Sequence, residues 1–141
     1  MGSNLWLLIA TFSIFICLSD FKRRQITNLH CMCIFVLCFL IFIQHYDHLN
    51  IINSTLVLII GFTLNRFNMI GGGDVKLLFA FSIAIAPNYL LLTVMVILFI
   101  GGLQAVILFL LSWYRKEAYT RGVPYGFAIC VGALLGIAAS I

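Results

Sequence analysis

Apolar residues fill long stretches of this chain, and charged or turn-forming residues interrupt them at five places. The interruptions lie at 20–28, 44–48, 65–74, 87–88 and 115–121, and they separate six apolar segments at 5–19, 29–43, 49–64, 75–86, 89–113 and 123–141. Residues 90–99 are apolar on every face apart from Thr93, so they do not alternate as the strands of a β-barrel do. The sequence therefore predicts an all-α bundle of six helices.

Composition indicates that the solvent around this bundle is lipid. Of the 141 residues, 64% are hydrophobic and 9% are charged, which leaves too few polar side chains to cover a soluble domain. We expect a single polytopic membrane domain over 1–141, with the lipid bilayer as its surroundings. The net charge of +4 is spread along the chain rather than massed, which excludes a nucleic-acid-binding protein.

The basic residues predict the topology. They all fall in or beside the first, third and fifth interruptions, as Lys22, Arg23, Arg24, Arg66, Lys76, Arg115, Lys116 and Arg121. In a six-helix alternation these interruptions share one side of the membrane. The positive-inside rule makes that side cytoplasmic, so both termini face outward. The first apolar segment is followed by its basic cluster, an order that predicts a retained span rather than a cleaved signal peptide.

Asp20 and Asp74 are the candidate catalytic residues, because each lies where an apolar segment meets a cytoplasmic loop. The structural alternative is a helix cap or an ion pair, which suits Asp74 at a helix start better than Asp20 at a helix end. Two neighbouring carboxylates tend to share a proton, so one can activate water while the other hydrogen-bonds a scissile carbonyl. The pair therefore predicts aspartic proteolysis, with Asp74 starting as the base and Asp20 as the acid.

Three glycines, Gly71, Gly72 and Gly73, come directly before Asp74 and are poorly suited to continue a helix. The segment that follows, 75–86, reaches about 18 Å as a helix, well short of a hydrocarbon core of about 30 Å. We therefore expect the glycines to form non-helical backbone within the membrane, beside a water-filled cavity. A flexible loop is the alternative.

Three motifs resemble one family, the type IV prepilin peptidases, which are GxGD membrane aspartyl proteases. Residues 71–77 read Gly-Gly-Gly-Asp-Val-Lys-Leu and fit the family's GxGDxKL pattern. Asp20 opens a basic loop that ends Ile-Thr-Asn at 26–28, where the family usually has Ile-Pro-Asn. Val-Pro-Tyr-Gly at 123–126 is similar to the family's motif before the last span. Thr27 in place of proline restores one backbone N–H, which is tolerable in a loop.

This resemblance implies an endopeptidase that removes the short leader from prepilins or pilin-like precursors at the cytoplasmic face of a bacterial inner membrane. It implies Asp20 and Asp74 as the catalytic aspartates, and no cofactor. The substrate-binding or supporting residues are expected to be Gly71, Gly72, Gly73, Lys76, Asn28, Pro124 and Tyr125. The tetracysteine segment of larger bifunctional members is absent, which implies a peptidase-only form similar to those of tight-adherence pili. Archaeal preflagellin peptidases are relatives as well.

Other chemistry-bearing residues have structural interpretations. The cysteines at 17, 31, 33, 38 and 130 lie in or at the edge of apolar segments without a zinc pattern, and we expect small core residues. We interpret His45, Asp47 and His48 as a solvated outer loop rather than a metal site. Gly132 and Gly136 have GxxxG spacing, which we assign to packing inside the bundle. A dimer face, and thus a homo-oligomer, is the alternative.

Two other functions fit parts of the pattern. A small ion- or proton-coupled carrier also uses intramembrane aspartates and broken helices, but it predicts an internal repeat, and the two halves show no convincing one. A structural membrane subunit would use its aspartates as helix caps, and the three glycines before Asp74 count against it.

Overall fold

The computed structural model describes residues 2–23, 27–45, 48–67, 70–115 and 124–141. In these ranges the chain forms six helices and no strand, so the all-α prediction is confirmed. The helices are α1 (Gly2–Arg23), α2 (Asn28–His45), α3 (His48–Arg66), α4 (Gly72–Ser82), α5 (Pro87–Arg115) and α6 (Tyr125–Ser140).

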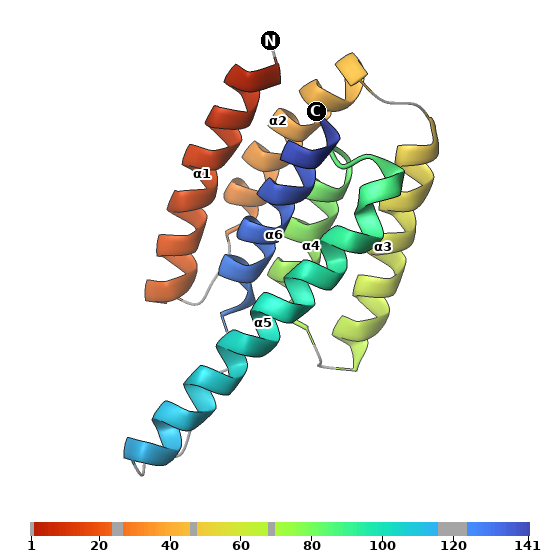
Figure 1. Ribbon diagram of the computed structural model, residues 1–141. Coiled ribbons are helices and arrows are strands. Elements are labelled where there is room, and N and C mark those ends of the chain that lie inside the picture. The colour runs from red at the N-terminus through yellow and green to blue at the C-terminus, as the bar shows by residue number, and fades with distance from the viewer. Residues whose placement is uncertain (1, 24–26, 46–47, 68–69, 116–123) are drawn as a thin grey trace.

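The short helix α4 and the last helix α6 form the centre of the bundle. α4 packs against α2, α3 and α6, while α6 also packs against α1 and α5. α5 crosses the bundle obliquely, and its C-terminal half extends beyond the other helices (Figure 1). Phe81 of α4 and Ile137 of α6 are fully buried. The hydrophobic core therefore lies along the two central helices.

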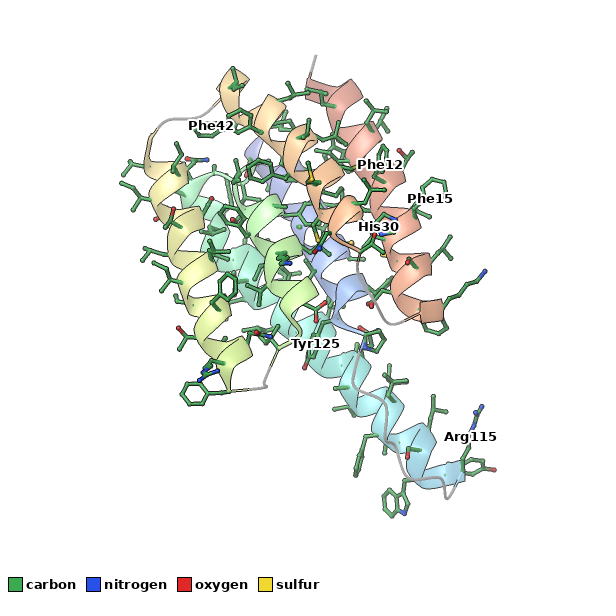
Figure 2. All side chains as sticks on the ribbon, turned by 180° about the vertical axis from the view of Figure 1, so that it is seen from behind. Phe12, Phe15, His30, Phe42, Arg115 and Tyr125 are labelled. Atoms are coloured by element: carbon green, nitrogen blue, oxygen red, sulfur yellow. The ribbon has the colours of Figure 1, made fainter. Side chains whose placement is uncertain are left out.

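Three helices are long and apolar enough to cross a membrane: 5–22 of α1, 49–66 of α3 and the whole of α5. α2 and α6 carry shorter apolar stretches, and α4 has 11 residues. The outside of the bundle is apolar too, as at Phe15 of α1, which is 65% exposed and projects outward (Figure 2). Extended apolar surface of this kind is typical of membrane contact. The crossing of all six helices stays a prediction.

α1 begins and α6 ends at one end of the bundle (Figure 1). The opposite end is formed by the last turns of α1 and α3 and the first turns of α2, α4 and α6, and we refer to it as the basic end (Figure 1). Lys22, Arg66 and Lys76 belong to these turns, and Arg115 ends the extension of α5 on the same side. This arrangement agrees with the predicted alternation. The outward orientation of the termini stays a prediction.

The helix boundaries differ from the predicted segments by a few residues, and two of these differences bear on the aspartates. α1 continues through Asp20 to Arg23, so the aspartate lies inside the last turn of a helix. α4 begins at Gly72 rather than at Val75, so two of the three glycines are helical. The prediction of a non-helical glycine run is therefore wrong for Gly72 and Gly73.

The turn between α4 and α5 is held by hydrogen bonds from two other helices. The amide of Asn50 in α3 donates to the carbonyl of Ile85 over 3.1 Å. The N–H of Ala86 donates to Ser140 Oγ of α6 over 2.9 Å. Because buried backbone polar groups are costly when unpaired, these bonds allow a non-helical turn inside the bundle.

Small residues set the contact between α5 and α6. Gly132 and Gly136 of α6 lie so close to Ile97 and Thr93 of α5 that a Cβ atom at either glycine would clash with them. The absence of side chains lets the two backbones approach. The structure thus supports the interpretation of the GxxxG spacing as packing inside the bundle.

Candidate functional site

Asp20 is held by the first turn of α6. The residue is buried, with 5% of its surface exposed, and its Oδ2 accepts the backbone N–H of Gly126 over 2.9 Å. Gly126 is the second residue of α6, where backbone N–H groups have no partner in their own helix and the dipole favours negative charge. The end of α1 disfavours a carboxylate, and the start of α6 compensates for it.

Glycine is required at position 126 by the closeness of Asp20. A Cβ atom there would lie 2.5 Å from Asp20 Oδ2 and 2.9 Å from its Cγ. The preceding residues fix this turn: Pro124 is buried, and the ring of Tyr125 contacts Gly101 of α5 at the basic end (Figure 2). The Pro-Tyr-Gly motif therefore positions Asp20 through the main chain.

Asp74 closes the first turn of its own helix. It is the third residue of α4 after the N-cap Gly71, and its carboxylate accepts the N–H of Gly71. This is the return contact of a capping box, and it satisfies one of the free donors at a helix start. The N–H of Val75 donates to the Gly71 carbonyl over 3.2 Å. These bonds explain why Gly72 and Gly73 are helical in spite of the low helix propensity of glycine.

The structure brings the two aspartates, 54 positions apart in sequence, to the basic end and within electrostatic reach of each other. Asp74 lies just before the predicted span 75–86 and is half-buried. Burial and, second, the charge of Asp20 raise the pKa of the Asp74 carboxyl to about 6, against the lowering effect of the Gly71 N–H. Two carboxyls that influence each other's ionisation, one of them with a raised pKa, are an arrangement suited to acid–base chemistry.

Lys76 and Asn28 form a second contact beside the aspartates. Lys76 Nζ donates to Asn28 Oδ1 over 3.0 Å, which links α4 to the first residue of α2. Both side chains are exposed. Further along α2, the thiol of Cys31 lies 3.9 Å from the carbonyl of Gly73 and donates a weak hydrogen bond to it. α2 therefore contacts the first turns of α4 at two points near Asp74.

Asn65 and Gly126 are residues of this site that the sequence reasoning missed. Asn65 Nδ2, in the last turn of α3, donates to the carbonyl of Ile70 over 2.7 Å. Ile70 directly precedes the N-cap Gly71, so Asn65 holds the entry to α4. Asn65 could have been found from the sequence as an amide at the edge of an apolar segment. Gly126 could have been found from its place in the Pro-Tyr-Gly motif.

The described residues contain no group of three or more His, Cys, Asp or Glu side chains that could hold a metal ion. The five cysteines are free, with those at 31, 38 and 130 buried and those at 17 and 33 half-buried, as expected for packing residues. Asp47 lies outside the described residues, as do the side chains of His45 and His48. The interpretation of that loop therefore stays a prediction.

Comparison with known protein families gives a match that covers most of the chain. A family model described as the type IV leader peptidase family matches residues 7–110. The matched region runs from α1 into α5 and contains both Asp20 and Asp74, whereas Tyr125 and Gly126 lie beyond it. No curated protein and no solved structure shows a significant match to the chain.

Proposed function

Since the chain belongs to the type IV leader peptidase family, we propose that it removes the short leader from type IV prepilins or pilin-like precursors. We place this aspartic endopeptidase in a bacterial inner membrane, with its site toward the cytoplasm. The observation that carries the proposal is the pairing of Asp20 with Asp74, each bonded to a backbone N–H near the start of a helix. The family match favours this activity over an ion-coupled carrier.

Asp20 is the base and Asp74 the acid in the proposed mechanism, the reverse of the roles expected from the sequence. The N–H of Gly126 and the start of α6 stabilise a carboxylate at Asp20. Asp74 is the carboxyl whose pKa is raised to about 6, chiefly by burial, so it keeps its proton more readily. The sequence could not show that Asp20 faces a second helix.

The proposed reaction needs only this pair and water. Asp20 takes a proton from water as the water oxygen attacks the scissile carbonyl carbon, and Asp74 gives its proton to the carbonyl oxygen. The C–N bond of the resulting diol then breaks. Asp20 gives its proton to the leaving nitrogen, and Asp74 recovers a proton from a hydroxyl group. Both carboxyls end in their starting states, and no cofactor takes part.

The other site residues support this pair. Gly71 and Gly72 are exposed and carry no side chain, which leaves the main chain beside Asp74 open to an extended leader peptide. Lys76 and Asn28, exposed at the basic end, are suited to contact the polar part of the precursor. The apolar exterior of the bundle suits a precursor whose own hydrophobic helix lies in the same bilayer.

Cleavage in cells tests the proposal. The chain is co-expressed with a panel of type IV prepilins and pilin-like precursors, and loss of the leader is followed by mass spectrometry. Asp20→Asn and Asp74→Asn keep the size of each side chain but cannot perform the proton transfers, so we expect each to abolish cleavage. Asp47→Asn, in the predicted outer loop, is the matched control and should cleave normally.

Two results would count against the proposal. Substantial cleavage by either single variant would refute the paired-aspartate mechanism. If the wild-type chain is well expressed and cleaves none of the precursors, the assigned substrate class is wrong.

A further inference from the structure

One peptide unit joins Asn65 to Asp74. Its carbonyl, from Ile70, accepts the amide of Asn65 over 2.7 Å, and its N–H, from Gly71, donates to the carboxylate of Asp74. Because a peptide unit is planar, the directions of its C=O and N–H are fixed relative to each other. Holding the carbonyl therefore also fixes where the N–H points. A hydrogen bond accepted by the carbonyl also polarises the unit and strengthens its N–H as a donor.

Among the described residues, little else fixes this peptide. Gly71 is exposed and has no side chain, and Gly72 and Gly73 follow it, so the local main chain has wide conformational freedom. A Cβ atom on Gly72 would lie 3.7 Å from Asn65 Nδ2, which shows that the asparagine packs against this segment. Asn65 thus restrains the part of the chain that intrinsic propensity restrains least.

A second asparagine of α3 makes the same kind of contact at the other end of α4. Asn50 Nδ2 donates to the carbonyl of Ile85, after α4, as Asn65 Nδ2 donates to Ile70, before α4. The two asparagines are 15 positions apart on α3, which is about 22 Å along a helix. α3 therefore holds both flanks of α4, but only Asn65 acts on the peptide that bonds Asp74. Asn50 is a matched control from the same helix.

We propose that Asn65 is a positioning residue for catalysis, which holds the Ile70–Gly71 peptide so that its N–H points at the Asp74 carboxyl. Asn65 does not touch the substrate in this proposal and acts only through that peptide. The inference rests on the proposed function in one respect, that Asp74 is catalytic.

Other titratable groups also bear on Asp74. Asp20 of α1 acts by its charge, and Cys31 of α2 lies within electrostatic reach of both Asp74 and Lys76. The helices around α4 and α4 itself carry further titratable residues near the basic end, namely His30, Arg66, Lys76 and Tyr125. None of these groups changes when Asn65 is replaced, so a shift in the titration of Asp74 reports on the Ile70–Gly71 peptide.

The first test is the pH dependence of leader cleavage by purified enzyme. Asn65→Ala should lower kcat by about 10- to 100-fold and leave KM within about twofold, because the acid is misplaced while the binding surface remains. The limb of the pH profile that Asp74 controls should move to higher pH. A weaker hydrogen bond from the Gly71 N–H stabilises the Asp74 carboxylate less, so the pKa of Asp74 rises. Asn65→Leu, which is close in size but cannot donate a hydrogen bond and adds no charge, should behave like Asn65→Ala.

The control separates positioning from general loosening of α4. Asn50→Ala should lower the thermal stability in detergent but leave the position of the pH limb unchanged. An unchanged limb in Asn65→Ala, or an equal shift in Asn50→Ala, would overturn the proposal.

A second readout does not depend on cleavage. The carboxyl stretch of Asp74, identified by subtracting the infrared spectrum of Asp74→Asn, is titrated in detergent micelles without substrate. We expect its midpoint to rise in Asn65→Ala and to stay in place in Asn50→Ala, and equal midpoints in all three proteins would refute the role of Asn65. If no precursor is cleaved, the proposed function fails, while this titration still decides the role of Asn65.

Discussion

One added methyl group at Gly126 is expected to disable the peptidase. A Cβ atom there would lie 2.5 Å from Asp20 Oδ2, whereas ordinary contact begins at 3.4 Å, so the carboxylate must retreat by about 0.9 Å. Such a movement breaks the 2.9 Å hydrogen bond from the Gly126 N–H. A hydrogen bond to a charged group contributes about 1.5–3 kcal/mol, which corresponds to about 10- to 150-fold in rate. We therefore expect kcat/KM of Gly126→Ala to fall about 100-fold.

The assay is leader cleavage by purified protein, with the melting temperature in detergent measured alongside. Gly102→Ala is the matched control, because a Cβ atom at Gly102 meets nothing within 4 Å. Alanine is favoured over glycine inside a helix by about 1 kcal/mol, so this control should be fully active and as stable as the wild type or more so. Folded Gly126→Ala protein with more than about half of the wild-type kcat/KM would show that the Gly126 contact does not position Asp20 for catalysis.

Further predictions concern pH, an exposed contact and packing. Because Asp74 is the proposed acid and burial raises its pKa to about 6, kcat/KM should fall as pH rises through about 6, and an increase there would make Asp74 the base. Lys76→Met should lower kcat/KM by less than about 10-fold, since its bond to Asn28 is exposed, and a 100-fold loss in the cleavage assay would contradict this. Gly132→Ala forces a methyl group against Ile97 and should lower the free energy of unfolding by about 1–3 kcal/mol. Its melting temperature should fall while kcat stays constant, and an unchanged melting temperature would contradict the prediction.

The helices could be predicted from sequence because each apolar segment is continuous and bounded by charged or turn-forming residues. The boundaries at the site could not. The glycines before Asp74 predict a helix break from propensity alone, yet the carboxylate bonds the Gly71 N–H and allows the helix to start at Gly72. This contact depends on where a side chain turns back on its own main chain, which a pattern of residue types does not specify.

The sequence singles out the two aspartates by their unusual positions, but the acid and base roles that it suggests are the reverse of those we propose. The dipole of its own helix makes Asp20 a poor anion site, and this local argument led to its assignment as the acid. The structure places Gly126, 106 positions later in the chain, against the same carboxylate. Asn65 was missed for a different reason, since its bond to Ile70 spans only five positions but links the end of α3 to the entry of α4. The Gly126 contact is tertiary and the Asn65 contact is local, and neither follows from the pattern of residue types.

Each aspartate of the site accepts a hydrogen bond from a main-chain N–H, Asp20 from Gly126 and Asp74 from Gly71. A main-chain donor is present in every amino acid except proline, so substitution does not remove it as it removes a donor side chain. Selection can act instead on the space around this donor. At both Gly71 and Gly126, a Cβ atom would press on the carboxylate that accepts the hydrogen bond. During evolution the polar chemistry of this site is therefore protected against most changes of neighbouring side chains. Its vulnerability is concentrated in two residues that carry no functional group at all.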